Sequence, residues 1–393
     1  MTFIAISHDG STAYAPDAAN NVIYAIRTSD FVVTGTVPDP HTILQAPEYI
    51  AMSPDGTKAY ISNVSSGHYS VGILDVADNM ITGSVTGAFN RPVGIAFTPD
   101  GSIAYVANTL GASVNVVDVV RDVVLSTLTG SFNHPSYIAT TTSSIETKSY
   151  VANALGNSVS IIVNNTVTGS VGGIFTSPNG IAITQNGATA YVANSANRVN
   201  IVDVTTNVVT GTVSGGTFAL PYFIAITPDG RTAYVSNTVI NTVSIIDLAT
   251  NAVTGTVSVG NNPQGLTITP NGQQVWVVNQ FANTISIIGY AISNLVNLQG
   301  CQIRQVVLGQ TNLINILTWQ PPITGTPVSY IIYRDALLTD VAGTVLATAH
   351  PLQFVDHSRK PGVTYTYYII AVDASGNTSA ASVIPVTQAC TKK

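Results

Sequence analysis

The first 290 residues alternate short β-branched runs with polar turns, as in IAITPDGRTAYVSNTVINTVSIID at residues 224–247. Hydrophobic positions recur there with the period of two that is typical of half-buried β-strands. In Pro228-Asp229-Gly230, proline presets the φ of a turn and glycine takes the positive φ. The pattern predicts four strands, which we call A to D, at residues 223–227, 232–236, 242–248 and 252–257.

This four-strand unit recurs along the chain. An aromatic residue of an AYxxN-like element marks each of seven copies at spacings of 41 to 46 residues: Tyr14, Tyr60, Tyr105, Tyr150, Tyr191, Tyr234 and Trp276. A period of this length with several short strands per copy, and without an amphipathic helical pattern, is typical of β-propeller blades. The first copy already contains all four strands, so we expect no blade shared between the two chain ends. The fourth copy lacks two residues at its C to D turn.

The repeated element resembles the YVTN β-propeller repeat of surface-layer and other exported proteins. The residues that carry the resemblance are AYVAN at 104–108, SYVAN at 149–153, AYVSN at 233–237 and VTGTV at 253–257. The resemblance covers roughly residues 2–290 and implies a seven-bladed propeller, which we place in residues 1–298. Separately, we expect residues 291–300 to supply a last outer strand and then a short linker. The resemblance implies little about function, because one fold carries many functions.

Beyond the propeller the period disappears. The segments LTWQPP at 317–322, SYIIYRD at 329–335 and KPGVTYTYYIIAVD at 360–373 resemble a fibronectin type III domain. The resemblance implies a β-sandwich in residues 299–393, with Trp319 in its core, Tyr333 on the third strand and Tyr365 after a turn. The fold class predicted for the whole chain is therefore all-β.

Composition narrows the function classes. Charged residues make up 8% and hydrophobic residues 45% of the 393 positions, which indicates a folded chain and favours an extracellular, cell-surface or periplasmic location. No apolar run approaches the roughly 18 residues of a membrane span. The N-terminus has no basic segment and enters a strand pattern at once, so we expect no signal peptide within this numbering. Seven basic and fifteen acidic residues precede residue 300, which argues against nucleic-acid binding.

A register of phenylalanines is the first candidate for a functional surface. Each lies three residues before a proline in the connection from strand D to strand A, at 43-residue intervals: Phe89, Phe132, Phe175 and Phe218. They either line a binding arc at the mouth of the central channel or wedge between adjacent blades. Strict repetition favours the wedge, because a packing requirement recurs in every blade whereas a ligand breaks the symmetry.

Non-repeating residues near those prolines are the better candidates for a ligand or partner site. They are Tyr49, Arg91, His134, Tyr137 and Tyr222. The repeated asparagines and the aspartates at the ends of strands C, by contrast, are best explained by side-chain bonds to their own turns. The six histidines have no zinc-ligand spacing, and no haem, nucleophile-elbow or phosphate-loop motif occurs. We therefore expect neither a metal nor a cofactor.

Cys301 and Cys390 are the two cysteines and bracket the C-terminal domain. Export favours a disulfide, whereas the fibronectin-like topology separates the two chain ends by roughly 20 Å, well beyond disulfide reach. The sequence leaves the bridged and free forms open.

Two hypotheses of different class follow. The first is a non-enzymatic exported or cell-surface protein whose two modules bind a protein or a glycan, or form part of a larger assembly. The alternative is a propeller enzyme of lactonase or lyase type with a polar, metal-binding central funnel. The first is favoured because strand A carries few acids or histidines and consists mostly of Ile, Ala and Thr.

Overall fold

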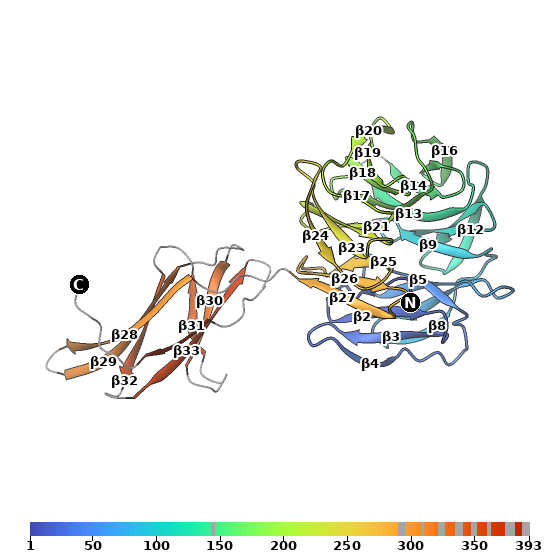
Figure 1. Ribbon diagram of the computed structural model, residues 1–393. Helices are drawn as coiled ribbons and strands as arrows, with labels where there is room; N and C mark the ends of the chain where they lie inside the picture. Colours follow the sequence, from blue (N-terminus) through green and yellow to red (C-terminus); the bar gives the residue numbers. More distant parts are fainter. Residues whose placement is uncertain are drawn as a thin grey trace. The chain divides into compact units, whose positions relative to one another are not determined.

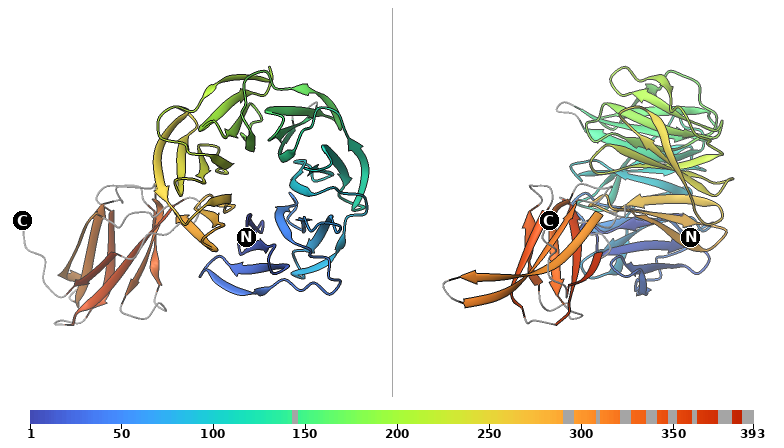
Figure 2. Two further views of the ribbon diagram at one scale, coloured as in Figure 1. Left: turned by 45° about the vertical axis from the view of Figure 1, so that its right-hand side comes forward. Right: turned by 60° about the vertical axis from the view of Figure 1, so that its left-hand side comes forward.

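The repeats fold into a seven-bladed β-propeller, in which the sheets stand in a ring around a central axis (Figures 1 and 2). The computed structural model describes residues 1–142, 146–289, 296–307, 310–320, 327–334, 341–346, 352–359, 363–373 and 382–386. The chain divides into two units, Met1–Ile288 and Gly289–Lys393.

Strands A and B form the inner half of each blade. The innermost strands are β1 (Ala5–Ile6), β5 (Pro47–Met52), β9 (Pro92–Phe97), β13 (Pro135–Thr142), β17 (Pro178–Ile183), β21 (Pro221–Ile226) and β25 (Pro263–Ile268). The second strands are β2 (Thr12–Asp17), β6 (Lys58–Asn63), β10 (Ile103–Asn108), β14 (Thr147–Asn153), β18 (Thr189–Asn194), β22 (Thr232–Asn237) and β26 (Gln274–Asn279).

Strands C and D form the outer half. The third strands are β3 (Val22–Arg27), β7 (Ser70–Asp75), β11 (Ser113–Asp118), β15 (Ser158–Val163), β19 (Arg198–Asp203), β23 (Thr242–Asp247) and β27 (Thr284–Gly289). The outer strands are β4 (Val32–Thr36), β8 (Met80–Ser84), β12 (Val123–Leu128), β16 (Thr166–Ser170), β20 (Val208–Thr212) and β24 (Ala252–Ser258). Among the described residues, the seventh blade is the three-stranded sheet β25-β26-β27.

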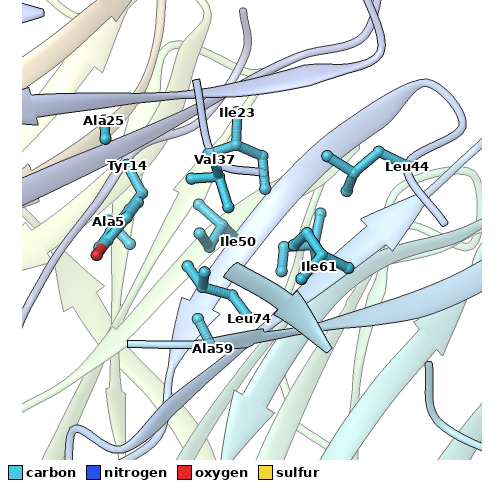
Figure 3. Close-up of a cluster of buried hydrophobic side chains, with 11 residues drawn as sticks. Ala5, Tyr14, Ile23, Ala25, Val37, Leu44, Ile50, Ala59, Ile61 and Leu74 are labelled. Atoms are coloured by element: carbon cyan, nitrogen blue, oxygen red, sulfur yellow. The ribbon is translucent and has the colours of Figure 1, made fainter. Parts of the chain in front are cut away.

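The hydrophobic core lies between the blades. Strands of the first and second blades contribute one cluster, in which Ile23, Ile50, Ile61 and Leu74 are buried against each other (Figure 3). Comparable clusters follow around the ring. Because each sheet buries both faces against its neighbours, β-branched residues occupy both faces of the strands.

The tyrosine of the repeated AYxxN element fastens the third, fourth and fifth blades each to the blade that follows. The hydroxyls of Tyr105, Tyr150 and Tyr191 donate hydrogen bonds to the side-chain carbonyls of Asn165, Asn207 and Asn251, at 2.6, 2.5 and 2.5 Å. Each asparagine lies in the C to D turn of the following blade. In these blades the contact gives the repeated tyrosine a structural role.

The predicted strands agree closely with those observed. In the sixth blade every strand end lies within two residues of its predicted position. In the fourth blade two residues separate β15 from β16, whereas four separate β19 from β20, as the shortened turn predicted.

The first and last blades each consist of contiguous chain, and they close the ring by packing. The amide of Gly265 donates a hydrogen bond to the carbonyl of Thr2, at 2.9 Å. Trp276 of the seventh blade is buried against Ile4, Ile6 and Ile26 of the first. No described strand is exchanged between the two blades.

The second unit contains two antiparallel sheets in its described residues. One has the order β28-β29-β32 and the other β31-β30-β33-β34. Their bounds are β28 (Val296–Val307), β29 (Gln310–Gln320), β30 (Pro327–Arg334), β31 (Val341–Leu346), β32 (Leu352–Arg359), β33 (Tyr365–Asp373) and β34 (Ser382–Val386). Residues 296–300, expected in an outer propeller strand or a linker, lie in β28 and pair with β29. Cys390 lies outside the described residues, so the structure does not test whether it is bridged to Cys301 or free.

No helix within the described part of the chain is long and apolar enough to cross a membrane.

Candidate functional site

The starts of the innermost strands form one face of the propeller, which we call the mouth. Six of these strands begin with a proline, and the residue before each proline has a positive φ, between 44° and 58°: Ala46, Arg91, His134, Ser177, Leu220 and Asn262. A left-handed residue turns the chain sharply into the strand. The same turn therefore brings Arg91 and His134 to the mouth.

An aromatic cluster forms the floor of the mouth. Phe3 lies at the centre, with its ring centroid 4.4 Å from that of Tyr49, 5.4 Å from Tyr137 and 5.2 Å from Phe223. Tyr137 also contacts Tyr222 and Phe223, at 5.9 and 5.5 Å between centroids. All five pairs are tilted or edge-to-face, and four of them lie within the distance range that favours aromatic packing.

Glycines alternate with these aromatics around the ring. Two positions after the initial proline, successive blades carry Tyr49, Gly94, Tyr137, Gly180, Phe223 and Gly265. A Cβ on Gly94 would lie 2.3 Å from the carbonyl oxygen of Ser136, and one on Gly180 would lie 2.7 Å from the Cα of Phe223. The glycines thus let adjacent strands approach closely enough to seal the floor.

A polar cluster lies above the floor. The guanidinium of Arg91 is 3.6 Å from the carboxylate of Glu48, and both side chains are partly exposed. Burial raises the pKa of Glu48 above its ordinary value, while Arg91 opposes the shift. Burial, and then the charge of Arg91, lower the pKa of His134. His134 Nδ1 is buried and has no hydrogen-bond partner among the described residues.

Two tyrosine hydroxyls complete the cluster. The hydroxyl of Tyr137 donates a hydrogen bond to that of Tyr222, at 2.8 Å. Burial raises the pKa of both phenols, and the charge of Glu48 raises both further. The tyrosines therefore stay neutral and offer hydrogen-bonding groups beside the Glu48 and Arg91 pair.

The structure brings four of the five predicted site residues, Arg91, His134, Tyr137 and Tyr222, into this cluster, and places Tyr49 in the floor. Glu48 was missed by the sequence reasoning. It directly follows Pro47, as Tyr222 follows Pro221, so an alignment of the residues after these prolines would have found it.

The phenylalanine register lies between blades. Phe132, Phe175 and Phe218 are 4 to 7% exposed, and Phe89 is partly buried in the cluster shared by the second and third blades. Each of the other three packs in a cluster formed by the two blades that it joins. Leu44 takes the same position in the second blade.

The repeated asparagines are buried and hold the loops of the mouth face. The side-chain carbonyls of Asn63, Asn108 and Asn194 accept hydrogen bonds from the backbone amides of Gln45, Asn90 and Thr176, at 3.0 to 3.2 Å. The aspartates of strand C accept bonds from their own turns, as in Asp247 with the amide of Thr250. These contacts are structural.

Below the floor, the central channel forms a cavity of about 430 Å³. Aliphatic side chains of the innermost strands line most of it, among them Ile50, Ile138 and Ile181, and Phe3, Tyr49 and Phe223 are also part of its lining. No Asp, Glu, His, Lys or Arg is among the described residues of its lining. Nor do three or more His, Cys, Asp or Glu gather at a metal-binding distance anywhere in the described part of the chain.

We expect Glu48→Gln to raise the melting temperature at pH 7. Because the folded-state pKa of Glu48 is raised, its favourable contribution is present below the unfolded pKa, about 4.3, and is lost as pH rises through the folded value. Near pH 3.5 the Glu48 carboxyl is itself protonated, and glutamine resembles the protonated carboxyl. The melting temperatures of Glu48→Gln and of the unsubstituted protein should therefore be about equal at that pH. Thermal unfolding at both pH values measures the difference.

Asp78→Asn, in an exposed turn, is the control, since it removes a carboxylate outside the mouth. A lower melting temperature of Glu48→Gln at pH 7 would mean that the ion pair with Arg91 outweighs burial.

Comparisons with known proteins agree with the fold. A family model described as "Lactonase, 7-bladed beta-propeller" matches residues 200–294. A solved structure described as Kuenenia stuttgartiensis hydrazine synthase is 19% identical with a TM-score of 0.62, and the match covers 74% of this chain and 95% of that one. Identity this low supports the propeller architecture alone. A search of curated proteins gives no match.

Proposed function

We propose that the protein is a non-enzymatic binding protein that acts outside the cell, at its surface or in the periplasm, and holds a glycan on its mouth. One observation carries the proposal. Polar groups from separate blades converge above a sealed aromatic floor, and His134 Nδ1 among them is buried without a partner. The exposed parts of the Arg91 and Glu48 side chains are available to the hydroxyls of a ligand.

The chemistry of the mouth favours a neutral polyhydroxylated ligand. Glu48 and Arg91 offset each other's charge, while Tyr222 and His134 add neutral hydrogen-bonding groups. Sugar hydroxyls both donate and accept, so this mixture suits them. A protein partner is the other outcome that a binding screen would reveal.

The second unit supports an exported, modular protein. Its strand order, β28-β29-β32 and β31-β30-β33-β34, is the one expected of a fibronectin type III domain. We infer that it acts as a spacer or an additional binding module. The AYVAN and VTGTV elements likewise favour a YVTN-type propeller.

We expect Arg91→Ala to weaken glycan binding by about tenfold or more, because a hydrogen bond to a charged group contributes roughly 1.5–3 kcal/mol. A glycan array followed by calorimetric titration measures the loss. Arg231→Ala, in an A to B turn outside the mouth, is the matched control and should bind as the unsubstituted protein does. If Arg91→Ala and Arg231→Ala bound the glycan with equal affinity, the binding site would lie outside the mouth.

An enzyme of lactonase type is the second candidate. The lactonase-family match supports it, as does the position of Glu48, with its raised pKa, beside Arg91 and near His134. Acids with perturbed pKa values cluster at catalytic sites. Turnover of small lactones that is lost in Glu48→Gln would establish this function and displace pure binding. Sensitivity of that turnover to a chelator would identify a metal requirement.

A further inference from the structure

The outer edge of the seventh blade differs from the other six. In each of those, a D strand covers strand C, whereas β27 has no partner on its outer side among the described residues (Figure 1). A groove of about 610 Å³ follows this edge to the first blade. Ile285, Ile287, Tyr24, Ile26, Phe31 and Trp276 are among its lining residues. Phe31 is 50% exposed there.

The six complete blades show what fills this position. Five D strands have the pattern Val/Ile-Thr-Gly-Ser/Thr-Val, and the final valines of four of them, Val37, Val85, Val171 and Val213, are 3 to 7% exposed, while Val257 of the sixth blade is half-buried. The amide of that valine donates to the carbonyl of the second residue of strand C, as Val213 does to Val199 at 2.9 Å. The glycine of the D strand lies opposite the fourth residue of strand C, as Gly211 of β20 lies opposite Ile201 of β19.

The same positions in β27 are Ile285 and Ile287, because TISIIG aligns with RVNIVD of β19 and TVSIID of β23. A strand of this pattern would therefore place its glycine opposite Ile287. Its last valine would donate to the carbonyl of Ile285 and enter the apolar groove.

The chain that follows β27 is too short to supply that strand. Six residues separate Gly289 from Val296, where β28 begins. In the other blades the C to D turn takes at least two residues and the D strand at least five. Because the residues from Val296 onward form β28 and pair with β29, they are not available to cover β27. A complete D strand for the seventh blade therefore has to come from outside this segment.

We propose that the open edge of β27 accepts a β-strand of Val/Ile-Thr-Gly-Ser/Thr-Val pattern donated by another polypeptide. Backbone hydrogen bonds along β27 supply affinity and the groove selects the valine, as in other strand-addition complexes. The D strands within this chain are already paired in their own blades, which makes a different polypeptide the donor. This surface is separate from the mouth and does not depend on the function proposed for it.

A labelled peptide of sequence NAVTGTVSV, that of residues 251–259, tests the proposal by fluorescence anisotropy with the full-length protein. We expect saturable binding that Ile287→Lys weakens by at least about tenfold, because it places a charge in an apolar groove. Replacing the peptide glycine by valine should cause a similar loss. Ile240→Lys, in a loop of the sixth blade, is the control and should bind normally.

Hydrogen exchange of the unsubstituted protein gives a readout that does not depend on the folding of the variant. Amides of β27 that become protected when the peptide is added would support the proposal. Protection, without peptide, of the β27 amides that point away from β26 would show that the chain's own residues cover the edge, and would overturn the proposal. The proposal would also be overturned if the unsubstituted protein did not bind the peptide. It would likewise be overturned if the Ile287→Lys and Ile240→Lys variants bound the peptide with equal affinity.

Discussion

Replacing Tyr137 with alanine should lower the free energy of unfolding of the propeller by about 3–5 kcal/mol, the range for aromatic truncation in a core. Tyr137 is 3% exposed and contacts four other aromatic rings at the centre of the floor. Because these rings come from three other blades, the cavity left behind cannot be filled by a shift of one strand. Denaturant unfolding followed by circular dichroism measures the loss.

Tyr137→Phe separates packing from hydrogen bonding. It keeps the ring and removes only the bond to Tyr222, so we expect a loss of about 1 kcal/mol. If Tyr137→Ala is no worse than Tyr137→Phe, the floor does not hold the blades together.

Gly94→Ala should have the second-largest effect, a loss of about 2–3 kcal/mol, because overpacking forces the backbone to move. The new Cβ would lie 2.3 Å from the carbonyl oxygen of Ser136 and 2.9 Å from the Cα of Tyr137. Since both neighbours are backbone atoms of the adjacent blade, no side-chain rotation relieves the clash. Thermal unfolding gives the stability change.

Gly211→Ala is the matched control for Gly94→Ala. It lies in the outer strand β20, where nothing is within 4 Å of the added Cβ. We expect little change in its melting temperature. Equal losses in the two variants would mean that strand glycines act through chain flexibility rather than through close approach.

The contrast between Glu48 and its neighbours shows where sequence reasoning reached its limit. Arg91, His134, Tyr137 and Tyr222 were found because they break the repeat beside a recurring proline. Glu48 directly follows the same kind of proline, so its place at the mouth was readable from the sequence, but its burial and its partner were not. Its burial and its contact with Arg91 appear only when the second and third blades pack together.

The outer strand expected within residues 291–300 illustrates a second limit. The sequence led us to expect a last outer strand and then a linker there, but Val296 and the residues that follow pair with β29 over a longer ladder. Competition between two pairing partners is decided by tertiary structure, because both use the same backbone groups.

The sequence by itself determined the number of blades, the positions of the strands and the turns that join them. These features depend on contacts between residues close in the chain, namely hairpin pairing, turn chemistry and alternation of hydrophobic positions. Only the tertiary structure decided what the mouth contains and which strand edge is left open. Those features depend on ring closure, which brings Phe3 within 5.2 Å of Phe223 although 220 positions separate them.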